Sequence, residues 1–135
     1  MASSLDQIRT HLIRADQDDR SQAVAIIPNV AVVESLPVGH DLTVVGISVL
    51  AATLPLAPTG TYLLTIAVSG TSLLVAANFD LKTIAVADTL EVLALSAVGG
   101  ALNLSATDVI KITCTSNTLD LTGTGLSFNI KTISR

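Results

Sequence analysis

Hydrophobic and polar residues alternate in short runs along most of this chain. From residue 24 onward, segments rich in Val, Ile and Thr recur between clusters of Gly, Pro, Asn, Asp and Ser, which is typical of strands separated by turns. About nine such segments, spaced by about ten residues, predict an all-β, jelly-roll-like sandwich of about eight to ten antiparallel strands. The predicted strands are 23–28, 30–35, 42–50, 61–69, 73–79, 82–87, 90–98, 109–115 and 126–133, with a shorter candidate at 118–121.

The segment 60–79, GTYLLTIAVSGTSLLVAANF, is apolar enough to raise the alternative of a membrane span. The polar stretch SGTS at 69–72 interrupts it and leaves no run near the roughly 20 apolar residues that a spanning helix needs. Its many β-branched residues also disfavour a helix. We therefore predict a hairpin with SGTS as its turn. One face of its first strand would carry Tyr62, Leu64, Ile66 and Val68, and the other Leu63, Thr65, Ala67 and Ser69.

The segment 90–98, LEVLALSAV, is apolar on both of its predicted faces. A sandwich normally leaves one face of each strand to water, so strands of this kind need cover on both sides. Because contiguous exposed apolar patches beyond a few hundred Å² are rare on monomers, we predict a homo-oligomer in which sister chains supply the cover. The alternative is that the outer faces are simply covered by Thr, Ser and Ala.

The first twenty residues differ from the rest in charge, since they hold seven of the chain's charged residues and the remaining 115 hold eleven. This shift predicts a boundary between an amino-terminal helix or arm with its linker (1–20) and a β-sandwich domain (21–135). The segment is charged throughout and lacks the continuous apolar region of a signal peptide. We therefore expect assembly in a cytoplasm.

Within this segment, an apolar stripe at helical spacing predicts a helix that begins at Leu5, with Ser4 and Gln7 as its capping box. A helix of about ten residues is marginal alone and needs a surface. It would pack on its own domain or dock as an arm on another subunit or protein, unless the segment is disordered. The following ADQDDR resembles a solvated linker. A calcium loop that begins at Asp16 would need Gly and Glu where Ser21 and Ile27 stand, which argues against a metal site there. The candidate partner-binding residues of the arm are Leu5, Ile8, Arg9, Leu12, Ile13, Arg14 and Arg20.

The charged and reactive residues argue against nucleic-acid binding and against enzymatic activity. A net charge of −4 without a basic cluster argues against nucleic acid as a partner. Cys114 is the one cysteine, so an internal disulfide is excluded, and its alternating context predicts a small buried residue. His40 beside Asp41 could begin an acid/base pair, but adjacent residues of a strand point to opposite faces. We therefore interpret His40 as a turn residue. No pattern indicates a metal or cofactor site, and we predict that the protein is not an enzyme.

Two segments, VADTLEVLAL and SATDVIKITC, both place an Asp after a small residue and just before an alternating strand. With TGTYLLTIAV before them and GLSFNIKTI at the end, this phrasing over about residues 40 to 133 resembles the small trimeric jelly-roll proteins that decorate the capsids of tailed bacteriophages. The resemblance implies a homotrimer on the capsid surface that bridges neighbouring major capsid subunits after the shell expands. It carries over no functional residue.

Two other functions fit an all-β chain of this size. A receptor-recognising knob of a phage fibre would use the amino-terminal helix as the stub of a trimeric stalk. The stripe from Leu5 to Ile13 spans fewer than two heptads, which favours an arm over a stalk. A small hydrolase or lyase on a cupin-like barrel would need a cluster of histidines and carboxylates, which the sequence lacks.

Overall fold

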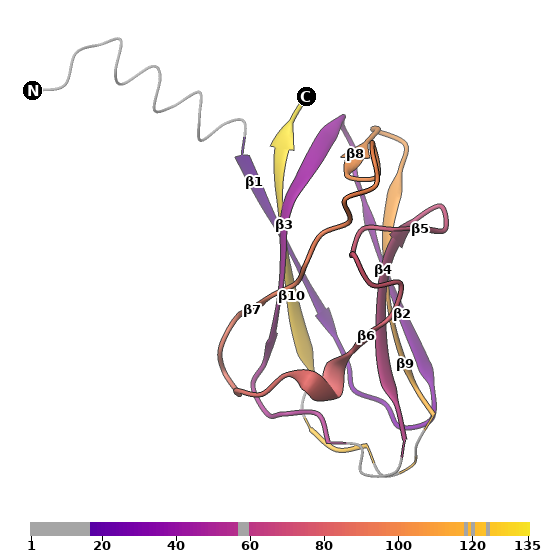
Figure 1. The fold of residues 1–135 in the computed structure, drawn as a ribbon, viewed down its shortest axis with the longest axis vertical. Coiled ribbons are helices and arrows are strands. Elements are labelled where there is room, and N and C mark those ends of the chain that lie inside the picture. Colours follow the sequence, from indigo (N-terminus) through magenta and orange to yellow (C-terminus); the bar gives the residue numbers. More distant parts are fainter. Residues whose placement is uncertain (1–16, 57–59, 118, 120, 124) are drawn as a thin grey trace, which may run out of the picture.

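Two antiparallel sheets lie face to face in the computed structural model of the chain, which describes residues 17–56, 60–117, 119, 121–123 and 125–135 (Figure 1). The first sheet contains β1 (Gln17–Val24), β10 (Leu126–Ser134) and β3 (Leu42–Ala51), with the short strands β7 (Glu91–Val92) and β8 (Asn103–Leu104) paired to β3. The second sheet contains β2 (Ala31–Pro37), β9 (Val109–Ser116) and β4 (Tyr62–Val68), with the short strands β5 (Thr71–Ser72) and β6 (Phe79–Asp80) paired to β4. One 3-10 turn, η1 (Leu81–Thr83), is the helical element of the described residues.

Strands that are early in the chain pair with strands that are late. In the first sheet β1 lies beside β10, and in the second sheet β2 lies beside β9, while β3 and β4 occupy the next positions inward. This order arises when one long antiparallel hairpin is rolled up into two layers, which is the jelly-roll arrangement. The predicted all-β sandwich is therefore confirmed. The predicted amino-terminal helix falls on residues outside those that the structure describes.

Alternation along the long strands builds the core between the sheets. In β4 and β9, every second side chain is buried and the side chains between them face outward. Fully burying an aliphatic side chain contributes about 1.5 to 3 kcal/mol, so the inner faces of the long strands supply most of the driving force for folding. The predicted division of β4 into two faces is confirmed, and the face with Tyr62, Leu64, Ile66 and Val68 is the buried one.

A β-bulge keeps both halves of β3 in register with the core. Lys131 on β10 is opposite Gly46, but the next residue, Thr132, is opposite Val44, so Val45 is the extra residue. Without the extra residue, one half of β3 would turn its apolar side chains to solvent, because a one-residue shift exchanges the two faces of a strand. The bulge leaves Val45 on the surface, 47% exposed.

The predicted strands at 73–79, 82–87 and 90–98 are largely wrong. The structure has only two-residue strands near the ends of these segments, and the chain between them runs as turns along the edge of the sandwich, from β4 to β3. Their apolar residues act as single anchors rather than as a strand face. The anchors that are buried in the core are Leu73, Leu74, Leu81, Ile84 and Leu93.

The predicted linker at the amino-terminal side of residue 20 is also wrong where it is described. Residues 17–20 belong to β1, which pairs with β10 along its whole length and ends at Val24. A polar segment can form this strand because it lies at the sheet edge, where Val24 is the one fully buried residue of the stretch 18–24. The predicted boundary near residue 20 therefore falls inside a strand.

The predicted hairpin turn at SGTS is confirmed, although its second strand is short. Ser69 and Gly70 both have positive φ angles, of 48° and 81°, and they join β4 to the two-residue β5. Such a two-residue turn follows the right-handed twist of the flanking strands.

Candidate interaction surface

The outer face of the second sheet carries small and β-branched side chains in three parallel rows. Residues directly opposite one another on β2, β9 and β4 share a rung of the sheet, such as Val33, Thr113 and Thr65. Hydroxyl and aliphatic groups are mixed on these rungs except at the pair Pro37 and Val109, and the described part of this face carries one charged side chain, Lys111. The outward residues are Ala31, Val33, Ser35 and Pro37 on β2, Val109, Lys111, Thr113 and Thr115 on β9, and Leu63, Thr65 and Ala67 on β4.

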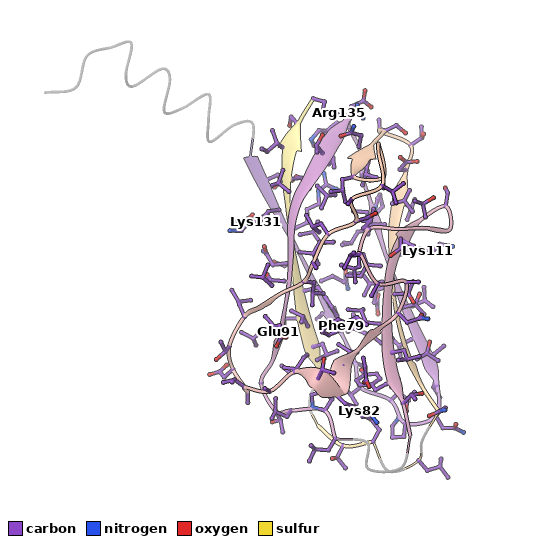
Figure 2. All side chains as sticks on the ribbon, viewed as in Figure 1. Phe79, Lys82, Glu91, Lys111, Lys131 and Arg135 are labelled. Carbon is purple, nitrogen blue, oxygen red and sulfur yellow. The ribbon has the colours of Figure 1, made fainter. Side chains whose placement is uncertain are left out.

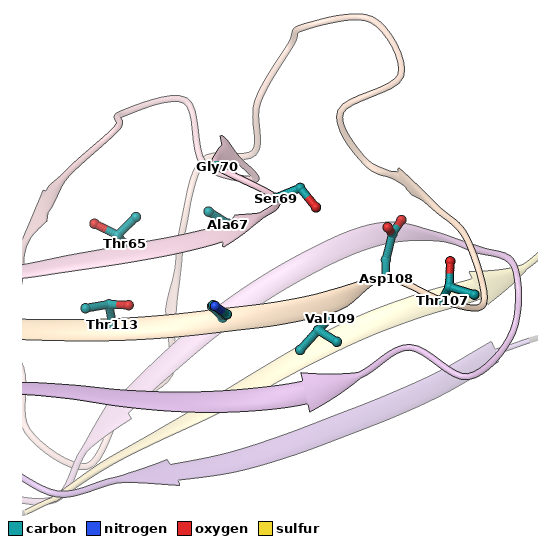
Figure 3. Close-up of a pocket in the computed structure, with 9 residues that line it drawn as sticks. Thr65, Ala67, Ser69, Gly70, Thr107, Asp108, Val109 and Thr113 are labelled. Atoms are coloured by element: carbon teal, nitrogen blue, oxygen red, sulfur yellow. The ribbon is translucent and has the colours of Figure 1, made fainter.

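A groove of ≈ 360 Å³ runs over β4 and β9 on this face. Figure 3 shows its lining, with Thr65 and Thr113 at one end and the Ser69–Gly70 turn and Thr107 at the other. The β4–β5 turn forms one wall and the loop before β9 forms the other, so segments far apart in the sequence meet here. We call this feature the threonine groove. Its lining residues are Thr65, Ala67, Ser69, Gly70, Thr107, Asp108, Val109, Lys111 and Thr113.

Lys111 is the positive charge of the threonine groove. Its cross-strand neighbours are Ser35 on β2 and Ala67 on β4, which are too short to cover it. It is exposed and forms no ion pair with any described residue. Figure 2 shows Lys111 projecting from the side of β9 and β4, while Lys131 projects from the opposite sheet.

Asp108, the acidic residue of the groove, already has a local role. Its Oδ2 accepts a hydrogen bond of 2.8 Å from the backbone N–H of Ser105, and this bond closes the turn that leads into β9. Thr65 donates its hydroxyl to the Asn78 side-chain oxygen at 3.2 Å, which leaves the Thr65 oxygen able to accept.

The outer face of the first sheet has a different character, because it exposes larger aliphatic side chains. Val92 is 79% exposed and Leu90 is 58% exposed, whereas Leu93 beside them is buried. They border a smaller groove of ≈ 230 Å³ that also includes Gly46, Ser48, Asn129 and Lys131. We call the exposed aliphatic residues on this side the aliphatic patch. They are Val45, Leu90, Val92 and Ile133.

Of the residues predicted to bind a partner, the structure describes only Arg20, and it places Arg20 inside the fold. Leu5, Ile8, Arg9, Leu12, Ile13 and Arg14 lie outside the described residues. The Arg20 guanidinium donates two hydrogen bonds of 2.7 Å, from Nη1 to the Pro37 carbonyl and from Nη2 to the Val38 carbonyl. Its Nε lies 3.4 Å from the Asp18 carboxylate. Arg20 therefore joins β1 to the end of β2, and its assignment to an exposed arm is corrected.

The remaining reactive side chains are separated from one another. His40 lies in the turn between β2 and β3, with its Nε2 3.3 Å from the Ser134 hydroxyl. Cys114 is buried in the core beside Tyr62, and burial raises the pKa of its thiol to about 12. Within the part of the chain that the structure describes, no group of three or more His, Cys, Asp or Glu side chains could hold a metal ion.

Sequence reasoning did not single out the threonine groove. The available signal was the alternation in VIKITCT, which places Lys111 on the outer face of its strand while its neighbours Ile110 and Ile112 are on the buried face. The walls come from the β4–β5 turn and the β8–β9 loop, whose proximity depends on the pairing of β4 with β9. Among the described residues, none of the helical segments is long and apolar enough to cross a membrane. No protein-family model matches the chain, and no curated protein or solved structure shows significant similarity to it.

Proposed function

We propose that this protein is a non-enzymatic structural protein of a bacteriophage virion, a homotrimeric decoration protein that binds the outside of the capsid. It would assemble in the host cytoplasm and bridge neighbouring major capsid subunits. The observation that carries the proposal is the aliphatic patch. Four aliphatic side chains, two of them more than half exposed, lie on one side of a chain that has few charges to keep copies apart.

The two outer faces suit two different contacts. The aliphatic patch offers large apolar side chains, which favour a lasting contact between identical subunits. The threonine groove offers hydroxyl groups and one ammonium, which favour recognition of a polar surface on another protein. A decoration protein needs both kinds of contact, since it holds to its own copies and to the shell.

Stabilisation of the capsid would follow from mass action. A protein that binds the assembled shell and not its separated subunits raises the free energy needed to take the shell apart, by an amount that grows with its concentration relative to Kd. The process needs no covalent step, and the rigid sandwich supplies a preformed surface, so little ordering opposes binding.

Self-association is tested by light scattering after size-exclusion chromatography. We expect the chain of 13.9 kDa to elute as a trimer. The Val92→Asp variant, with a charge in the aliphatic patch, should shift to the monomer. The matched control is Val75→Asp, because Val75 is 66% exposed but lies outside the patch. A wild-type monomer at high concentration would contradict the proposal.

Capsid binding is tested by sedimentation with expanded, undecorated phage shells. Saturable co-sedimentation of the wild-type protein, and a higher temperature of shell disruption in its presence, are the expected results. If the protein binds host cells and does not bind shells, the result would support a second candidate, a receptor-binding knob of a phage fibre. The observation that favours this second candidate is the threonine groove, a hollow of ≈ 360 Å³ on the outer face of the second sheet.

A further inference from the structure

We propose that the threonine groove binds a carboxylate side chain on an extended segment of a partner protein, and that Lys111 is the residue that anchors this carboxylate. The inference deepens the proposed function, because it assigns a chemistry to the partner surface that the second sheet would recognise. It depends on the outer face of β9 and β4 alone and not on the amino-terminal segment.

The ammonium group of Lys111, and not the summed charge of the groove, offers the binding point for an anionic group, because Asp108 also lines the groove. Lys111 has no acidic partner among the described residues, and its neighbours Ser35 and Ala67 leave its ammonium group open to approach. The acidic residue of the groove, Asp108, is engaged by the Ser105 N–H. A carboxylate that docks beside Lys111 would form a charge-assisted hydrogen bond, which is stronger than a neutral one.

The shape and lining of the groove suit an extended polypeptide. Thr65 and Thr113 lie one rung from Lys111 on one side, and Ser69 and Thr107 lie beyond it on the other. The Thr65 hydroxyl, which already donates to Asn78, can accept from an N–H of an extended chain, and the Thr113 hydroxyl can donate to a C=O or accept from an N–H. Apart from Lys111, the side chains that line the groove are short, and a backbone can therefore approach the sheet closely beside it.

Aliphatic groups in and beside the groove add contacts that a peptide would use. Val33 on β2 is 51% exposed and Val109 on β9 is 37% exposed, and both belong to the same outer face. A sugar ligand would favour an aromatic platform, but Tyr62 and Phe128 are buried and Phe79 packs against the core. The face therefore favours an acidic peptide segment over an anionic sugar.

The test is a titration of ¹⁵N-labelled protein with poly-L-glutamate at low ionic strength, followed by NMR. We expect saturable shift changes at the amides of Lys111, Thr65, Thr113 and Thr107. The Lys111→Met variant, which keeps the length of the side chain, should weaken binding about tenfold or more. The matched control, Lys131→Met, removes a lysine from the opposite sheet and should leave the affinity unchanged.

Three results would overturn the inference. No saturable shifts at the groove would remove the site, and an equal loss of affinity in Lys111→Met and Lys131→Met would reduce it to non-specific charge attraction. A parallel titration with polygalacturonate that shifts the same amides at lower concentration would show a sugar site instead. Because the titration contains no shells, its failure is distinct from a failure of the protein to bind capsids.

Discussion

Arg20 on β1 and Pro37 on β2 are joined across the open edge of the sandwich by a hydrogen bond of 2.7 Å from the guanidinium to the carbonyl oxygen. Backbone bonds join Val38 to Asp108 and Val30 to Ser116, so the alternate residues of β2, Pro37 among them, direct their backbone groups to the free edge. Pro37 has no N–H and its carbonyl is occupied by Arg20. This end of the edge is therefore closed to further strands.

Replacement of Arg20 should destabilise the fold. Arg20→Ala removes two hydrogen bonds from a charged donor whose side chain is only 16% exposed, and we expect a loss of about 1 to 3 kcal/mol in the free energy of unfolding. Arg20→Lys should recover only part of this loss. Lysine keeps the positive charge, but its ammonium group lacks the planar pair of N–H donors that reaches both carbonyls. Urea denaturation measures both changes. Ser21→Ala, at an exposed position on the same strand, is the control and should change stability by less than about 0.5 kcal/mol.

Two glycines with positive φ should respond differently to alanine. At Gly70, with φ of +81°, a Cβ atom meets open space, so Gly70→Ala costs only the backbone strain of about 1 to 2 kcal/mol. At Gly123, with φ of +130°, a Cβ atom would lie 3.0 Å from the Leu54 carbonyl oxygen, which adds a steric cost of about 1 to 3 kcal/mol. Thermal unfolding should therefore rank Gly123→Ala as the less stable variant, and the reverse order would contradict this account.

Stability should fall at alkaline pH because of the buried Cys114 thiol. Burial raises its pKa from 9.0 to about 12, so the folded protein keeps a proton that the unfolded chain releases. The contribution of the thiol is complete below about pH 9 and is lost as the pH rises toward 12, with a slope of up to about 1.4 kcal/mol per pH unit. Urea titrations between pH 7 and pH 11 should show this decline. Cys114→Ala should flatten it between pH 9 and 10, and an unchanged slope would argue against the thiol as its source.

The Tyr62 hydroxyl should contribute little to stability. It is buried and makes no hydrogen bond of normal geometry, and its polar neighbour is the Cys114 thiol, a weak hydrogen-bonding group. Tyr62→Phe should leave the urea midpoint unchanged or raise the free energy of unfolding by up to about 1 kcal/mol. Leu64→Ala, at the next inward position of β4, is the contrasting variant, with an expected loss of about 2 to 5 kcal/mol. A loss above about 2 kcal/mol for Tyr62→Phe would reveal an interaction of its hydroxyl group.

The long strands could be predicted from sequence because their alternation is forced by a core on one side and solvent on the other. The inner and outer residues of β4 follow from this pattern alone, from Tyr62 to Val68. The segments at 73–98 carry similar spacing but anchor turns, because they cover the edge of the sandwich and have only short stretches of β3 and β4 to pair with. Local pattern does not distinguish a strand face from a series of anchors.

The candidate site was harder to predict, for a physical reason. Arg20 lies in a charged stretch that reads as solvated, and only the approach of β2 to β1 provides its acceptors. Lys111 reads as one exposed residue of a strand, and only the turn at Gly70 and the loop at Thr107 make a groove around it. Both depend on contacts between distant segments, which a single sequence does not reveal.

The pairing of β1 with β10 also constrains how this protein can be made. Thr132 on β10 donates its hydroxyl to the carbonyl of Asp18 on β1, and 114 positions separate the two residues. Until β10 has been synthesised, β1 has no neighbour to complete its ladder, so the first sheet of the sandwich is completed only after β10 emerges. Such distant pairing slows folding, and we expect the denatured chain to acquire protease resistance late and in one step when it refolds.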